Sequence, residues 1–258
     1  MAASVPASGV VPDEIGFGES EKRVNRRGMG AMLTRLPLSG LSVIMLAAVA
    51  LLTMPAARTQ PAAGEALLDA AQQGDAAAVR RLIAARILLD PVGRGGRTPL
   101  LIAVEGNHLE VATLLIAAGA NLNAQAANAD SPWLLAGALG RAEMLRLMIP
   151  KGPDLSLRNR FGGNALIPAC ERGHVEAVRV LLTTAIDVNH VNNLGWTCLL
   201  EIVILGDGGP RHVEVTRLVL AAGANPNLAD KDGVSPLVHA GRKGQREIAR
   251  QIEAAGGR

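Results

Sequence analysis

Apolar positions along this chain follow a helical period, and the whole pattern returns at a fixed interval. Residues 97–125 read RTPLLIAVEGNHLEVATLLIAAGANLNAQ, which is a Thr-Pro-Leu start, a short apolar stretch, a turn and a second apolar stretch closed by glycine. Positions equivalent to Thr98 recur three times at steps of 33 residues and once at a step of 38: Ser131, Asn164, Thr197 and Ser235. A period of this length predicts a stack of repeated helical pairs.

A second marker keeps the same register. Nine residues after each start comes a residue suited to a tight turn: Asn107, Gly140, Gly173, Gly206 and Gly244. One step of the same length before Asn107 lies Gly74, which indicates a first, degenerate unit starting at Glu65. The long step is explained by five extra residues, Asp207 to Arg211, placed in the turn between two helices. Gly and Pro in that insertion are typical of a loop.

Each unit has residues with a physical role. The Thr, Ser or Asn at the start can cap a helix, and a proline often follows where its missing N–H is harmless. A small residue five positions after the start lets neighbouring helices approach closely: Ala70, Ala103, Ala136, Ala169 and Ala240. Trp133 takes the place of the leucine in Thr-Pro-Leu, which predicts that its ring is in the core.

These residues resemble the ankyrin repeat, above all GRTPLLIAVEGNHLEVATLLIAAGANLNAQ and GVSPLVHAGRKGQREIARQIEAAGG. The His of the family's Thr-Pro-Leu-His is absent, and KGPDLSLRNR replaces the usual Gly-Ala-Asn run in the third unit. The resemblance implies an all-α repeat solenoid of helix-turn-helix units joined by β-hairpin fingers. Six units are expected within residues 65–258, at about 65–95, 96–128, 129–161, 162–194, 195–232 and 233–258.

The first 64 residues do not follow the repeat. Residues 1–35 are polar, Gly-rich and basic near their end, which predicts a disordered region. Residues 36–57 begin with an uncharged apolar run, 36–54, preceded by five Lys and Arg residues. That asymmetry predicts export through a signal peptide or a signal anchor, and no clean cleavage motif decides between the two. The repeats are then expected in the periplasm or otherwise outside the cytoplasm, attached to a membrane only if 36–54 remains uncleaved.

Charge and motifs argue against several classes of function. Residues 58–258 carry 21 Lys plus Arg and 19 Asp plus Glu, so a strongly basic nucleic-acid-binding face is not expected. The stretch GRGGR at 93–97 lacks the Lys-Ser/Thr of a phosphate loop and is expected at a finger tip. No spacing indicates a catalytic group, a metal site or a cofactor site. His108, His174 and His212 share one repeat position, which predicts a structural role.

The chain has two cysteines, Cys170 and Cys198, on neighbouring first helices. Those helices are expected to pack side by side at roughly 10 Å, and the two cysteines are offset by five residues, or about 7.5 Å along the axis. A disulfide needs Cα atoms within about 7 Å. Two free and largely buried thiols are therefore expected, although export would permit a disulfide.

Binding is expected on the finger tips and the concave face. The candidate residues are those that the register places on exposed finger positions or at the end of the first helix: Arg97, Asp130, Arg160, Phe161, Arg172, Leu194 and Trp196. Phe161, Leu194 and Trp196 are the core of this predicted patch, because Trp and Arg are enriched among interface hot spots. The alternative for Trp196 is that its ring folds back onto the neighbouring finger.

Three functions fit these observations. The first is a non-catalytic scaffold, monomeric, that binds a protein partner outside the cytoplasm. The second is a secreted effector that binds host proteins, which the apolar segment argues against. The third is a periplasmic ligand carrier or, as the family resemblance suggests, an accessory protein in defence against peroxide.

Overall fold

The computed structural model describes residues 60–258, and the predicted export segment lies outside this range. Twelve α-helices and two short 3₁₀ turns occur in the described residues. Their bounds are α1 Gln60–Gln73, α2 Ala76–Ala84, η1 Arg94–Gly96, α3 Pro99–Glu105, α4 Leu109–Ala118, α5 Pro132–Ala138, α6 Ala142–Met148, η2 Ile149–Lys151, α7 Leu166–Glu171, α8 Val175–Leu181, α9 Cys198–Leu205, α10 Pro210–Ala221, α11 Pro236–Arg242 and α12 Arg246–Ala254. None of these helices is long and apolar enough to cross a membrane.

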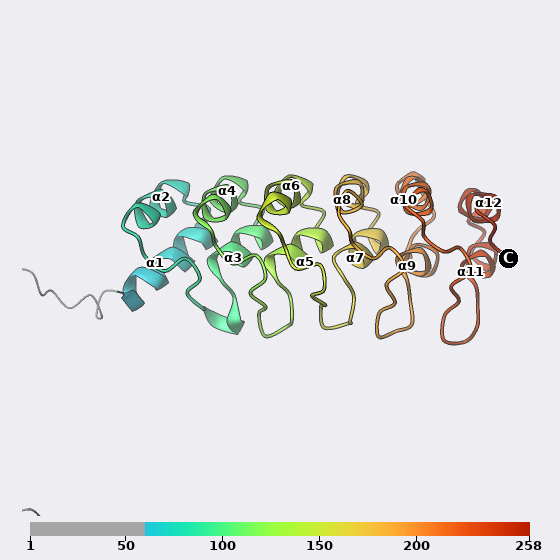
Figure 1. The fold of residues 1–258 in the computed structure, drawn as a ribbon, viewed down its shortest axis with the longest axis horizontal. Helices are drawn as coiled ribbons and strands as arrows, with labels where there is room; N and C mark the ends of the chain where they lie inside the picture. The colour runs from blue at the N-terminus through green and yellow to red at the C-terminus, as the bar shows by residue number, and fades with distance from the viewer. Residues whose placement is uncertain (1–59) are drawn as a thin grey trace, which may run out of the picture. The chain divides into compact units, whose positions relative to one another are not determined.

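The helices of residues 60–258 form two parallel layers. The odd-numbered helices, α1 to α11, make an inner layer, and the even-numbered helices, α2 to α12, make an outer layer beside it (Figure 1). Five loops, here called fingers 1 to 5 in chain order, leave the outer helix of one pair and return to the inner helix of the next (Figure 1). Each pair packs mainly on its neighbours, as in other repeat solenoids. The predicted all-α repeat solenoid is confirmed.

The residues that open each unit are helix caps, as predicted. Thr98, Ser131, Thr197 and Ser235 each accept a hydrogen bond from the backbone N–H three residues later, at 3.2 to 3.4 Å. Asn164 Oδ1 accepts from the N–H groups of Leu166 and Ile167 at 3.1 and 3.2 Å. These bonds satisfy donors that have no partner within the helix. The cap positions therefore set where every inner helix from α3 onward begins.

Most predicted turn residues have the left-handed backbone that the turn requires. Asn107 has φ +57°, and Gly74, Gly140, Gly173 and Gly244 have φ between +64° and +71°. Gly206 differs, because the insertion moves the left-handed residue to Gly208, with φ +70°. The inserted residues also lengthen α10, which begins at Pro210 and has 12 residues.

The expected β-hairpins are wrong in detail, because residues 60–258 contain no strand. Each finger is closed by two backbone hydrogen bonds of 2.8 to 3.1 Å that both involve the first residue of the turn, for example Asn159 N to Gly163 O and Gly162 N to Asn159 O. Neighbouring fingers share few backbone bonds, such as the one from Asn193 N to Phe161 O. Two bonds at a single residue close a turn but leave no ladder long enough to define a strand. GRGGR is at the tip of finger 1, as predicted.

The core runs along the whole stack between the two layers. It consists of aliphatic side chains from both layers together with Trp133, which is 1% exposed as its register predicted. The alanines five residues after each start are buried where inner helices meet, with exposed fractions of 6% or less: Ala70, Ala103, Ala136, Ala169 and Ala240. The continuous core is what makes each unit depend on the next.

At two junctions of the inner layer, the end of one inner helix closely approaches the start of the next. Gly137 is six residues after its start and Ala165 is one residue after the following start. A Cβ at Gly137 would lie 2.4 Å from the carbonyl oxygen of Ala165 and 2.9 Å from its Cβ. The inner helices are therefore staggered and do not start level.

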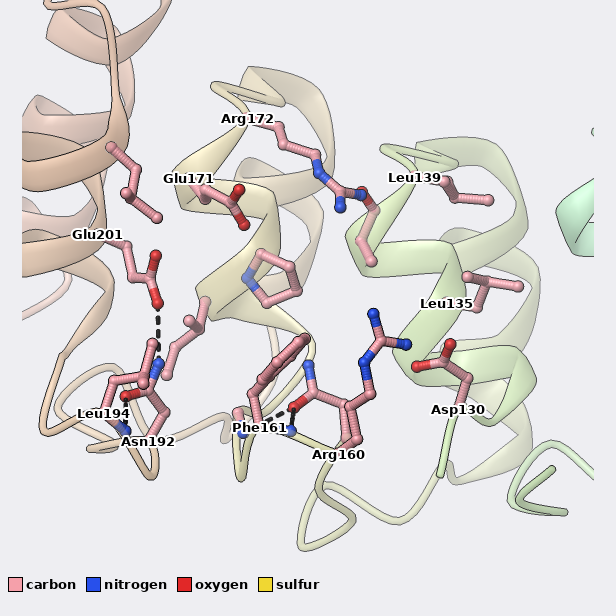
Figure 2. A pocket seen from close by; sticks show the side chains of 16 residues that line it. Asp130, Leu135, Leu139, Arg160, Phe161, Glu171, Arg172, Asn192, Leu194 and Glu201 are labelled. Carbon is pink, nitrogen blue, oxygen red and sulfur yellow. Dashed lines mark hydrogen bonds between the residues drawn. The ribbon is translucent and has the colours of Figure 1, made fainter. Parts of the chain in front are cut away.

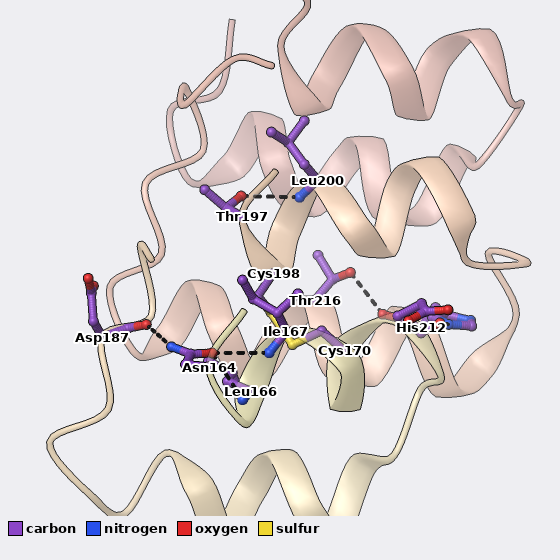
Figure 3. The surroundings of a disulfide bond; sticks show 11 residues. Asn164, Leu166, Ile167, Cys170, Asp187, Thr197, Cys198, Leu200, His212 and Thr216 are labelled. Atoms are coloured by element: carbon purple, nitrogen blue, oxygen red, sulfur yellow. Dashed lines mark hydrogen bonds between the residues drawn. A yellow bond between two sulfur atoms is a disulfide. The ribbon is translucent and has the colours of Figure 1, made fainter. Parts of the chain in front are cut away.

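The same stagger joins the two cysteines. Cys170 and Cys198 occupy these two positions at the next junction, their Cα atoms are 5.6 Å apart, and they form a disulfide between α7 and α9 (Figure 3). Both residues are fully buried. The prediction of two free thiols is wrong, because it placed the inner helices level with each other and at a typical interaxial distance.

Gly137 and Gly241 occupy the same repeat position, but an added Cβ at Gly241 would meet nothing within 4 Å in the part of the chain that the structure describes. We expect Gly137→Ala to destabilise the protein by roughly 1–3 kcal/mol through overpacking against backbone. Gly241→Ala should be neutral or stabilising by up to about 1 kcal/mol, because alanine favours the helix. Urea unfolding followed by circular dichroism measures both, and equal effects would contradict the staggered contact.

The disulfide closes a loop with a sequence separation of 28 residues. Loss of such a loop constraint is expected to destabilise the folded state by roughly 2–4 kcal/mol. We expect dithiothreitol to lower the urea midpoint of the wild-type protein and to leave that of the Cys170→Ala/Cys198→Ala variant unchanged. A wild-type midpoint insensitive to reduction would argue against a stabilising disulfide.

Candidate functional site

A cavity of about 330 Å³ lies in the angle between the inner helices and the fingers of the central units. We call it the concave pocket. Its walls come from α5, α7 and α9 and from the tips of fingers 2, 3 and 4 (Figure 2). The volume is at the lower end of the range for ligand-binding pockets, ~300–1,000 Å³. It is the place where the two predicted binding surfaces, the finger tips and the inner helices, meet.

Exposed apolar side chains surround the concave pocket. Phe161, Leu194 and Leu205 line it and are 50%, 47% and 50% exposed. The guanidinium of Arg160 lies over the Phe161 ring, 4.6 Å from its centroid, which is a favourable cation–π geometry. Large apolar groups gathered at one rim are typical of interaction sites. A partner that covered this rim would remove their surface from water.

The inner wall contains a buried carboxyl group. Glu201 is 4% exposed and lies on α9, between apolar neighbours of the sequence CLLEIVIL. Its Oε1 accepts a hydrogen bond of 2.8 Å from Asn192 Nδ2 in finger 4. Asn192 Oδ1 in turn accepts from the N–H groups of Leu194 and Trp196, both at 3.0 Å. Asn192 thus joins the finger tip to the inner helix and holds both Leu194 and Glu201 in place.

The two ends of the concave pocket differ in charge. At one end Arg160 and Arg172 act on Asp130, whose pKa is nevertheless raised above its usual value because burial outweighs them. At the other end burial and the nearby Glu171 carboxylate raise the pKa of Glu201 to about 7, against the opposing hydrogen bond from Asn192. At the first end two arginines thus partly oppose the effect of burial on the carboxylate, whereas the second end places two carboxyl groups together (Figure 2).

The structure brings most of the predicted binding residues together. Asp130, Arg160, Phe161, Arg172 and Leu194 all line the concave pocket. Their role in binding stays a prediction.

Two predicted residues lie elsewhere. Trp196 is half-buried and packs against the core, and it does not line the concave pocket. Arg97 is engaged by Glu105, with Nη1 to Oε2 at 2.8 Å, beside a smaller neighbouring cavity.

Glu171, Glu201 and Asn192 were missed by the sequence reasoning. A usable signal existed for Glu201, which is a carboxyl four residues after its start, where the three preceding units have Ile102, Leu135 and Pro168. A charged group in an otherwise apolar helix is rarely buried without a reason. Asn192 offered no such signal, because Asn is common in turns.

The histidines have structural partners among the described residues. His212 Nε2 contacts the carbonyl oxygen of Glu171 at 2.9 Å, and its Nδ1 contacts Asp207 Oδ1 at 2.6 Å. His239 Nε2 contacts Asp230 Oδ2 at 2.7 Å. Residues 60–258 contain no cluster of His, Cys, Asp and Glu arranged to hold a metal ion. The contacts of His212 fit the structural role predicted from its repeat position.

A stack of helical pairs with fingers on one side and a pocket on its inner face defines a repeat scaffold of the binding type. Residues 40–126 and 133–228 match the family described as ankyrin repeats (3 copies), and the chain belongs to this family. Ankyrin repeats are generally protein–protein interaction modules and typically non-catalytic.

Known proteins support this assignment. A crystal structure of an ankyrin repeat domain from Acinetobacter baumannii AYE is 47% identical, with a TM-score of 0.72, and the match covers 74% of this chain and 98% of that one. The ankyrin repeat domain of Bcl-3, a member of the IkappaB protein family, is 27% identical, with a TM-score of 0.66 over 75% and 86% of the chains. The putative ankyrin repeat protein YahD of Escherichia coli K12 is 46% identical over 61 residues, 24% of this chain and 30% of that protein.

The pKa of Glu201 predicts a pH dependence of stability. The pKa of this carboxyl group is about 7 in the folded state, compared with an ordinary value of 4.5. Between these two pH values the folded state therefore binds more protons than the unfolded state. Its ionisation therefore lowers stability as the pH rises from about 4.5 to 7, by roughly 2 kcal/mol once solvent screening is allowed for. We expect the Glu201→Gln variant to lose less stability than the wild type between about pH 4.5 and 7. Urea unfolding at several pH values measures this difference. A pH profile unchanged by the substitution would contradict the assignment.

Proposed function

We propose that this protein is a non-catalytic scaffold that binds a protein partner outside the cytoplasm through the concave pocket and the finger tips around it. The observation that carries the proposal is the exposed apolar rim formed by Phe161, Leu194 and Leu205 at the angle between fingers and inner helices. Hot spots of protein interfaces are commonly apolar or aromatic anchors next to a pocket, with Arg among the enriched residues. Arg160 and Arg172 lie at the same pocket.

Two observations support action outside the cytoplasm. The apolar run 36–54 with basic residues before it is typical of an export signal or anchor. The buried disulfide between Cys170 and Cys198 is of the kind that forms and persists in oxidising compartments and is rare in the cytosol. The two observations are independent, because one comes from the first 54 residues and the other from the repeat core.

The proposal is tested by capturing the tagged full chain from its native host after cross-linking in living cells. We expect a partner with the wild-type protein and a loss of about tenfold or more with Phe161→Ala/Leu194→Ala, which removes two apolar anchors. The matched control is Leu88→Ala/Val92→Ala, because those side chains are 67% and 70% exposed and lie in finger 1. Equal capture by all three proteins would overturn the assignment of the binding surface.

The compartment is tested in the same cells. We expect the chain in the periplasmic or extracellular fraction, with its cysteines resistant to alkylation under denaturing conditions until a reductant is added. A cytoplasmic protein with two freely alkylated thiols under denaturing conditions would refute export.

A further inference from the structure

The acidic end of the concave pocket has a carboxyl oxygen without a partner. Glu201 is more than nine-tenths buried, and its one hydrogen bond within residues 60–258 engages Oε1. Oε2 has no hydrogen-bond donor from that part of the chain and is not among its buried unpartnered atoms, so solvent reaches it on the pocket side (Figure 2). This oxygen is therefore free to accept a hydrogen bond from a bound group that carries N–H donors.

The neighbouring charges specify the sign of that group. The charged group that acts on Glu201 is the carboxylate of Glu171, one inner helix away on α7. Arg172 is turned to the other side, where its Nη1 donates to the carbonyl oxygen of Ala138 at 2.6 Å. Arg160 is held over the Phe161 ring. Two carboxyl groups that share one end of a pocket, with the arginines engaged elsewhere, attract a cation.

The size and lining of the pocket limit the form of that cation. The same cavity continues from Glu171 and Glu201 to the apolar side chains of Phe161, Leu194 and Leu205. A lone inorganic cation would leave that apolar rim uncovered. A lysine or arginine side chain has an apolar stem and a charged tip that donates hydrogen bonds, and it fits both parts of the lining.

We propose that the concave pocket binds an extended peptide segment of the partner, with a lysine or arginine placed between Glu171 and Glu201 and an adjacent apolar residue packed on Phe161 and Leu194. This inference rests on the proposed function and specifies the chemistry of the partner. The cationic side chain of the peptide complements the charge at the acidic end of the pocket, and its apolar residue complements the apolar rim. Asn192 holds the two parts at a fixed spacing through its bonds to Glu201 and to the Leu194 N–H.

The test uses the full wild-type chain and a phage-displayed library of random 12-residue peptides, selected for binding to the wild-type protein alone. We expect the selected peptides to contain Lys or Arg within one or two residues of an apolar side chain. In fluorescence anisotropy, Glu201→Gln and Glu171→Gln should each weaken a selected peptide by about tenfold, the loss of a hydrogen bond to a charged group. Replacing its Lys by norleucine should weaken it similarly.

The controls separate a local effect from a general one. Glu176→Gln, on the outer helix α8 where Glu176 pairs with Arg146 and Arg179, should leave peptide affinity unchanged. Glu171 is partly exposed, so its variant tests the proposal even if Glu201→Gln alters folding. Peptides without a cationic residue that bind both glutamine variants as well as the wild type would overturn this inference, as would a selection that yields no binder.

The outcome is distinguishable from failure of the proposed function. If selected peptides lack a cation but lose binding with Phe161→Ala/Leu194→Ala, the binding surface stands and the cationic anchor is wrong. If tetramethylene diamine alone displaces a peptide at equal concentration, the pocket is a small-amine site and the peptide proposal fails.

Discussion

The close approach of each inner helix to the next is the constraint on which the rest of the structure depends. At the junction of α5 and α7 a glycine lies against the backbone of the following helix start, and at the junction of α7 and α9 the equivalent positions are joined covalently. This contact sets the stagger of the inner layer. The stagger in turn determines which finger tip lies above which helix, and so it forms the angle in which the concave pocket lies.

Polar contacts between finger and helix fix that angle further in two adjacent units. The carboxyl group lies on the helix in the first unit and in the finger in the second. In the first, Asn192 donates a hydrogen bond to the carboxyl group of Glu201. In the second, the ring of His239 contacts the carboxyl group of Asp230. Both pairs span nine residues and join the start of a finger turn to the fourth residue after the helix start. The unit before them has Asn159 and Pro168, so no such bond forms there, and both residues line the pocket.

Much of the fold followed from the sequence because its signals are local. Thr98 and its equivalents cap helices through contacts three residues long, and Trp133 is buried because its repeat position is a core position. The disulfide and the Glu171–Glu201 pair could not be predicted in the same way, since both depend on the stagger between units. The ring of Trp196 depends on packing against the core, which register alone does not determine. The binding residues were placed near the right surface, but the acidic end of the pocket was not foreseen.

The disulfide has a mechanical consequence for a stacked array. Repeat proteins pulled from their ends lose units one after another, because each unit is held mainly by its neighbours. Here the segment between Cys170 and Cys198, a separation of 28 residues, cannot extend while the bond is intact. That segment includes α8 and finger 4, and its two ends lie directly beside Glu171 and close to Glu201 in sequence. Under tension the array can unfold from either end, while α7 and α9, which carry the two carboxyl groups, remain joined by the disulfide.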